Sequence, residues 1–115
     1  FNLCPINLVY DISGNPSKKI KYAFLSIIKE ALSNIIKHSD ATQVSITLRE
    51  HPALYQLIVK YNGTKKAVNT DDGIGLKNIE DRVNSLNGIV NINNDKGFVV
   101  FISVPKEKQN ENSNS

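Results

Sequence analysis

The sequence predicts an α/β two-layer sandwich in which helices cover one face of a mixed, mainly antiparallel sheet. The elements follow one another as strand, helix, strand pair, loop, helix, strand pair. Residues 42–50 alternate apolar and polar positions, which is typical of a half-buried strand, and residues 54–61 place Tyr55, Leu57 and Val59 at every second position. Residues 20–35 instead repeat apolar positions with the 3.6-residue period of a helix. Because most strands arrive in pairs and not as single β-α-β units, the sheet is expected to be mixed or antiparallel.

The first strand and the first helix are predicted from residues 6–37. "INLVYDIS" (6–13) indicates a strand, and "GNPSKK" after it indicates a turn and a helix start, with Asn15 or Ser17 as the capping residue. The helix is expected to run to about Lys37. Its apolar stripe consists of Ile20, Phe24, Ile27, Ile28, Ala31 and Ile35.

The next two strands are predicted to form a hairpin. "HPA" (51–53) is a turn between residues 42–50 and residues 54–61. By the alternation of the second strand, Tyr55, Leu57 and Val59 face the core. Tyr61 has the same parity, so its side chain is expected to point inward as well.

The C-terminal half is predicted to hold a loop, a helix and a second hairpin. Residues 62–75 are polar and contain glycines, so they indicate a loop. A helix is expected from about Leu76, with Gly88 as the left-handed residue that ends it. Residues 89–93 and 97–105 then form the last hairpin. The folded domain is predicted to span residues 1–105, and the polar residues 106–115 are predicted to be a disordered tail. The second helix is expected to bury Leu76, Ile79, Val83 and Leu86.

Composition limits the classes of function. The chain has 115 residues, enough for one domain with one core, and a net charge of +3, which makes no case for nucleic acid binding. Its single cysteine, Cys4, allows no internal disulfide and fits a reducing compartment. No apolar run reaches membrane-spanning length. Because the chain opens on Phe1, we expect it to be a piece of a longer protein.

Three polar residues of the first helix border its apolar stripe. Glu30, Asn34 and Lys37 lie on one ridge, since positions i, i+4 and i+7 of a helix stack on the same side. Burying such groups without partners costs about 1–3 kcal/mol each. A divalent cation suits a carboxylate and an amide oxygen, and a lysine suits the phosphates that the cation carries. A solvated helix flank capped by His38 is the alternative interpretation.

A second candidate is "DDGIGLKNIEDR" (71–82), in which Gly73 and Gly75 lead directly into a helix. The first turn of a helix has free N–H groups and a partial positive charge, and glycines let the backbone approach an anion closely. This pattern predicts a phosphate site, although a simple turn has the same pattern.

Together these stretches resemble a known family. "EALSNIIKHSDATQVSI", "GIGLKNIEDRVNSLNG" and "KGFVVFISVP" are similar to the ATP-binding catalytic domain of sensor histidine kinases, an ATPase fold shared with gyrase, MutL-type repair proteins and the large heat-shock chaperones. The form "KEALSNIIKHSDAT" looks most like the nitrate-sensor and lipid-fluidity-sensor subgroup. The resemblance covers roughly residues 6–105.

The resemblance implies a role for each matching residue. Asn34 would bind Mg²⁺, and Glu30 would be the catalytic residue that orients a metal-bound water. Lys37 and His38 would lie near the phosphates of ATP. Residues 64–72 would form a nucleotide lid. The backbone of the second glycine box would hold the phosphates, and it matches Gly73, Gly75 and Leu76.

The sequence departs from the family at two positions on the adenine side. The first glycine box normally reads Asp-x-Gly, and its aspartate accepts a hydrogen bond from adenine; here the box ends in Gly63 and the aspartate position is Tyr61. Phe98 stands where the family usually has a threonine that assists adenine binding. If the domain still binds MgATP, adenine is expected to stack against Tyr61 or Phe98. Asp71 or Asp72 of the lid is a candidate substitute for the missing carboxylate.

The resemblance therefore implies a cytoplasmic domain of a membrane-anchored two-component sensor. The domain would bind MgATP, deliver the γ-phosphoryl to a histidine on a separate dimerisation domain, and act indirectly on a response regulator. This chain alone is expected to be a monomer that does not phosphorylate itself. One alternative is a degenerate, regulatory module whose adenine pocket is filled by Tyr61 and Phe98. The other is an anti-sigma-factor serine kinase, which shares the fold.

Overall fold

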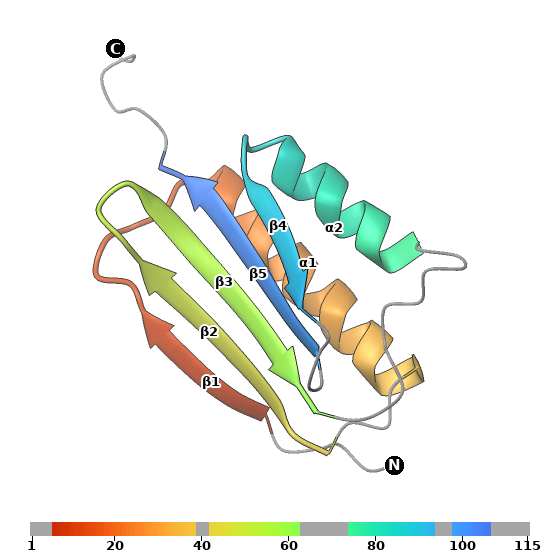
Figure 1. The fold of residues 1–115 in the computed structure, drawn as a ribbon. Helices are drawn as coiled ribbons and strands as arrows, with labels where there is room; N and C mark the ends of the chain where they lie inside the picture. The colour runs from red at the N-terminus through yellow and green to blue at the C-terminus, as the bar shows by residue number, and fades with distance from the viewer. Residues whose placement is uncertain (1–5, 39–41, 63–73, 94–97, 107–115) are drawn as a thin grey trace.

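The structure of this chain is a computed structural model that describes residues 6–38, 42–62, 74–93 and 98–106. Two helices lie on one side of a five-stranded sheet with the strand order β1-β2-β3-β5-β4 (Figure 1). β1 is parallel to β2, and the other neighbouring strands are antiparallel. This confirms the predicted two-layer fold and both predicted hairpins. The elements are β1 (Ile6–Asp11), α1 (Lys18–His38), β2 (Val44–Glu50), β3 (Leu54–Tyr61), α2 (Ile74–Asn84), β4 (Ile89–Asn93) and β5 (Phe98–Pro105).

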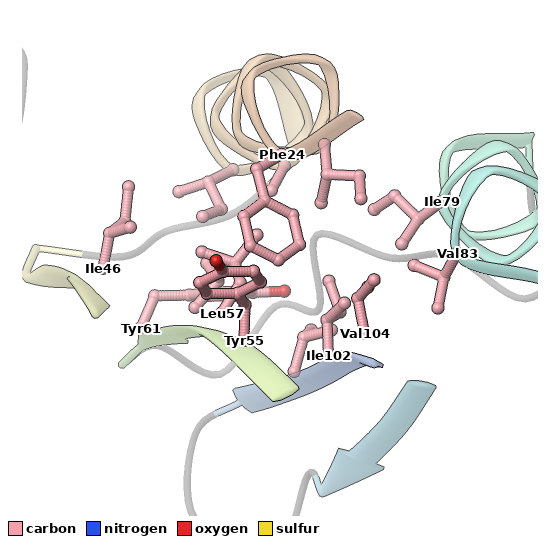
Figure 2. Close-up of a cluster of buried hydrophobic side chains, with 14 of the residues drawn as sticks. Phe24, Ile46, Tyr55, Leu57, Tyr61, Ile79, Val83, Ile102 and Val104 are labelled. Carbon is pink, nitrogen blue, oxygen red and sulfur yellow. The ribbon is translucent and has the colours of Figure 1, made fainter. Parts of the chain in front are cut away.

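The core lies between the sheet and the two helices. β3 is the central strand, and its inward residues Leu57, Val59 and Tyr61 are each less than 5% exposed, as the alternation predicted. Figure 2 shows Phe24 reaching down from α1, and Val83 from α2, toward the inward side chains of the strands. One continuous cluster of apolar side chains therefore joins both layers.

The start of α1 follows from one capping residue. Ser17 accepts a hydrogen bond from the backbone N–H of Ile20 at 3.3 Å, and its carbonyl accepts one from the N–H of Lys21 at 2.9 Å. Ser17 is thus the N-cap, and Asn15, the other predicted candidate, is not. The predicted apolar stripe is buried except for Ile28, which is partly exposed.

The end of α2 differs from the prediction. Asn87, not Gly88, has the left-handed conformation, with a φ of 61°. The N–H of Asn87 donates to the carbonyl of Asn84, and the N–H of Gly88 donates to the carbonyl of Val83, which is the Schellman pattern with Asn87 at C′. Gly88 is needed for another reason: a Cβ there would lie 2.5 Å from the carbonyl oxygen of Ser103. The helix also begins at Ile74, two residues before the predicted start.

A polar cluster closes the end of the sheet where β2 turns into β3. One oxygen of Glu50 accepts hydrogen bonds from the backbone N–H groups of Ser13 (3.0 Å) and Gly14 (2.9 Å), and the other pairs with Lys106 Nζ at 2.7 Å. Lys106 Nζ also lies 5.3 Å from the ring centroid of Tyr55. The hydrogen bond from Lys106 and then those from Gly14 and Ser13 lower the pKa of Glu50 to about 2.

Lys106, the last described residue, also makes a backbone contact beside this cluster. The backbone N–H of Lys106 donates to the carbonyl of Ala53 at 3.0 Å, so ordered contacts continue one residue past the predicted boundary at residue 105. The remainder of the predicted tail, residues 107–115, lies outside the described residues.

β1 is the least covered element of the fold. It forms one edge of the sheet, away from both helices (Figure 1), and all six of its residues are exposed. Leu8 and Tyr10 are each 61% exposed, and Ile6 is 47% exposed. Neither described helix has the length and apolarity that a membrane span requires.

Candidate functional site

The topology brings the described candidate residues to one end of the sheet. β3 ends at Tyr61, which pairs with Val44 at the start of β2 and with Phe98 at the start of β5. α1 ends at His38, six residues before β2 begins, so its C-terminal turns lie toward this end of the sheet. We call this region, opposite the Glu50 cluster, the site end of the sheet.

Glu30 and Asn34 occupy the flank of α1 one turn apart. Both side chains are half-buried, in agreement with their predicted place at the border of the apolar stripe. None of the hydrogen bonds or ion pairs found among the described residues involves either side chain. Within the described part of the chain, these two half-buried polar side chains are therefore available to a ligand or to water.

Tyr61 and Phe98 fill the adjoining part of the core. Each is 4% exposed. Their rings are stacked with centroids 5.2 Å apart and an interplanar angle of 30°. An offset stack of this kind is a favourable aromatic contact in addition to the burial of apolar area. Tyr61 points inward, as its parity predicted, and the two aromatic departures from the family pattern contact each other.

The two glycine-rich stretches are described only in part. α2 begins at Ile74, so the backbone of Gly75 and Leu76 lies in the first turn of the helix, where N–H groups are free of intrahelical partners. Gly63, Asp72 and Gly73 lie outside the described residues, as does the predicted lid, residues 64–72. In α1, the backbone of Lys37 and His38 continues the helix, but the described side chains of that helix end at Ile35.

A pocket among the described residues is not formed by the predicted site residues together. It has a volume of about 460 Å³ and opens at the ends of β1, β2 and β3, where Asn7, Ser45 and Lys60 contribute polar groups. Among the predicted site residues whose side chains are described, Tyr61 is the one that lines it. Glu30, Asn34 and Phe98 do not line this pocket.

Sequence reasoning did not identify Asn62, whose side chain links the start of β2 to the end of β3. The side-chain oxygen of Asn62 accepts hydrogen bonds from the backbone N–H groups of Thr42 (2.8 Å) and Gln43 (2.9 Å), and its nitrogen donates to the hydroxyl of Thr42 at 2.9 Å. Asn62 therefore fixes the start of β2 beside the end of β3, next to Tyr61. Its partners are about twenty positions away in the chain, so no local pattern indicates this role.

The side-chain oxygens of Glu30 and Asn34 can be compared with the ligands that Mg²⁺, implied by the family resemblance, requires. Glu30 and Asn34 offer oxygen ligands, and Mg²⁺ is commonly held by one or two protein oxygens while waters and phosphates complete its octahedron. No group of three or more His, Cys, Asp or Glu residues that could hold a metal occurs among the described residues. Glu30 and Asn34 thus carry oxygen donors of the type that Mg²⁺ accepts, whereas the stacked pair Tyr61 and Phe98 occupies core space.

The chain is similar in sequence to sensor histidine kinases. It is 30% identical over 84 residues to sensor histidine kinase YvfT of Bacillus subtilis, covering 73% of this chain and 23% of that protein. It is 30% identical over 116 positions to sensor protein VraS of Staphylococcus saprophyticus, covering 95% of this chain and 33% of that protein. The chain thus spans from 23% to 33% of the length of these relatives. No protein-family model matches the chain.

The fold is similar to that of solved histidine kinases. The blue-light activated histidine kinase of Erythrobacter litoralis EL346 superposes with a TM-score of 0.71 at 18% identity, over 90% of this chain and 38% of the other. Histidine kinase AdeS of Acinetobacter baumannii superposes with a TM-score of 0.65 at 16% identity, over 90% of this chain and 55% of the other. The chain is therefore a homologue of part of the sensor histidine kinases and has a fold found in histidine kinase domains.

Proposed function

We propose that this chain is the MgATP-binding catalytic part of a two-component sensor histidine kinase. In this proposal the chain delivers the γ-phosphoryl to a histidine on a separate dimerisation domain, in a membrane-anchored sensor with its kinase part in the cytoplasm, and a response regulator acts downstream. The finer assignment is to the nitrate-sensor and lipid-fluidity-sensor subgroup, and it rests on the form of residues 29–42 alone.

The observation that carries the proposal is the pair Glu30 and Asn34. Two polar side chains on the flank of a core helix, half-buried and without a hydrogen bond or ion pair among the described residues, have a physical reason if a hydrated cation binds against them. Asn34 would be the metal ligand and Glu30 would orient a metal-bound water. Phosphoryl transfer depends on positioning and charge stabilisation more than on covalent protein chemistry, so this short set of residues suffices.

The phosphates would be held by the start of α2 and by the last turn of α1. Backbone N–H groups around Gly73 and Gly75 would face the anion, with Leu76 completing the glycine box. Lys37 and His38 would add positive charge and hydrogen-bond donors, as a lysine does in many phosphate sites. The proposal assigns Gly63 and Asp72 to the part of the site that binds adenine. Asp72 would take over part of the role of the family's aspartate, whose position is occupied here by Tyr61.

The experiment is a calorimetric titration of the 115-residue chain with ADP and with a non-hydrolysable ATP analogue, with and without magnesium. Magnesium-dependent binding that is lost in Asn34→Ala and kept in Asn91→Ala is the expected result. Asn91 is a matched control because it is an exposed asparagine on β4, where it pairs with Phe101. Equal binding by both variants would contradict the assigned metal ligand.

A second candidate function rests on the stack of Tyr61 and Phe98. Both rings are buried in the core. In this alternative they fill the space that the adenine base would need, and the chain is a regulatory module that does not bind nucleotide. No binding by the parent chain and a gain of binding in Tyr61→Asp would support this candidate. A carboxylate at so buried a position is costly, so Tyr61→Ala is needed as a second, uncharged opening of the pocket.

A third candidate, an anti-sigma-factor serine kinase, keeps the same nucleotide chemistry with a different acceptor. Incubation of the chain with radiolabelled ATP and either a histidine-containing dimerisation domain or a serine-containing partner separates the two by the stability of the product, since a phosphohistidine is lost in acid and a phosphoserine is not.

A further inference from the structure

The outward surface of α1 has an unusual composition. Between Lys18 and Ile35, the part of the helix with described side chains, every exposed position is either a lysine or a large apolar residue. Tyr22 is 67% exposed and Leu25 is 57% exposed. We call these residues the α1 outer stripe, and they are Lys18, Lys19, Lys21, Tyr22, Leu25 and Lys29.

The stripe is continuous along the helix. Lys18, Tyr22, Leu25 and Lys29 follow the spacing i, i+4, i+7 and i+11, so they lie above one another on one face. At a rise of 1.5 Å per residue the face extends about 16 Å along the axis. This face is opposite the buried stripe of the helix, and the sheet lies on the other side of α1 (Figure 1).

Helix stability does not account for the lysines. Three of them lie in the first turn of α1, which contains no acidic residue, so they oppose the partial positive charge of the helix N-terminus. The three ion pairs found among the described residues join Arg49 to Asp11, Lys77 to Asp81 and Lys106 to Glu50, and none of them neutralises the stripe.

The second helix provides the contrast within the same molecule. The exposed residues of α2 include Lys77, Glu80, Asp81 and Arg82, so both signs of charge are interspersed. Lys77 pairs with Asp81 one turn later at 3.9 Å, and Arg82 lies in the last turn, where a cation is favourable. This is an ordinary solvated face, whereas the α1 outer stripe is a cationic face with two large apolar side chains within it.

We propose that the α1 outer stripe docks on a layer of anionic lipid headgroups. The lysines complement the negative surface potential of such a layer, where each basic side chain contributes to binding additively. Tyrosine is favoured at a lipid–water interface, and a leucine between lysines can enter the boundary between headgroups and acyl chains. The outer side of a single helix is convex, so it suits a planar surface. The inference does not depend on nucleotide binding.

The test is co-sedimentation of the 115-residue chain with vesicles of phosphatidylcholine alone and of phosphatidylcholine mixed with phosphatidylglycerol. Binding to the mixed vesicles alone, weakening with added salt, is expected. The triple variant Lys18→Gln, Lys21→Gln, Lys29→Gln should bind about a hundredfold more weakly. The matched control removes three other cations, all outside the stripe: Arg49→Gln, Lys77→Gln, Arg82→Gln.

The control variant shows whether binding depends on the positions of the lysines in the α1 outer stripe or only on the net charge of the chain. Both triple variants lower the net charge from +3 to 0, so equal loss of binding in the two would overturn the proposal. Tyr22→Ser with Leu25→Ser leaves the charge unchanged and should also weaken binding, while circular dichroism melts confirm that each variant is folded. If this variant binds as well as the parent chain, the apolar part of the proposal is wrong.

Two further measurements distinguish other anionic partners. Inorganic phosphate should release the chain from vesicles no better than chloride at the same ionic strength, and a stronger effect of phosphate would indicate a phosphate site instead. A soluble glutamate-rich peptide should bind more weakly than the mixed vesicles do. Tighter, stripe-dependent binding of the peptide would overturn the lipid proposal in favour of an acidic protein partner.

Discussion

Replacing Phe98 with alanine tests whether the aromatic pair at the site end is part of the core. Phe98 is 4% exposed and stacked on Tyr61, so the substitution removes a nearly complete burial and leaves a cavity. Buried Phe→Ala changes cost about 3–5 kcal/mol. A chain of this length is stable by about 6–17 kcal/mol, so the variant should still fold.

The assay is urea unfolding followed by circular dichroism. A loss of about 4 kcal/mol divided by a urea m-value of about 2 kcal/mol/M predicts a midpoint lower by about 2 M with an unchanged slope. In a double-mutant cycle with Tyr61→Ala, the coupling free energy between the two rings should be about 0.5–1.5 kcal/mol.

The matched control is Phe101→Ala. Phe101 lies three residues further along β5, on the face of the sheet away from the helices, and is only partly buried. The cost of that change should be less than half the cost at Phe98. If the two phenylalanine variants lose equal stability, or if the coupling to Tyr61 is zero, the stacked pair does not form part of the core as the structure places it.

Three further predictions concern other parts of the fold. The pKa of Glu50 is lowered from its ordinary value of 4.5 to about 2. Its ionised form therefore adds stability that is present above pH 4.5 and is lost as the pH falls toward 2. Glu50→Gln should remove this pH dependence from the midpoint of urea unfolding. Gly88→Ala should lower the free energy of unfolding by about 1–3 kcal/mol, measured by urea unfolding. The new Cβ would lie 2.5 Å from the carbonyl oxygen of Ser103 and 2.7 Å from Val83 Cγ1. Ser17→Ala should lower the free energy of unfolding by about 0.5–2 kcal/mol through loss of the α1 cap, whereas Ser17→Asp should retain it.

Local patterns predicted the elements and their faces because burial repeats with a fixed period. Leu57, Val59 and Tyr61 lie two positions apart along β3, so they share the inward face of the pleated strand. The flank position of Glu30 and Asn34 follows from helical spacing in the same way. The hairpins were predictable because their strands are close in sequence, with a short turn between them.

The polar contacts between distant segments were not predictable in this way. Glu50 and Lys106 are 56 positions apart, and nothing in either local sequence indicates the other. Asn87 shows a different limit: both Asn and Gly tolerate the left-handed conformation, so the local sequence does not determine which of these two neighbours adopts it. The start of α1 was ambiguous for a related reason, since Asn15 and Ser17 are both good caps.

The position of β1 has a consequence for how the chain folds and opens. β1 pairs with β2 alone, and 32 residues separate its end at Asp11 from the start of β2 at Val44, whereas β2 and β3 are joined by a three-residue turn. The entropy of closing the longer connection must be offset before the parallel pair forms, so β1 should join the sheet after the β2–β3 hairpin. Having no helix over it, β1 should also be the first strand to detach in native-state fluctuations, and its amide protons should exchange with solvent sooner than those of β3.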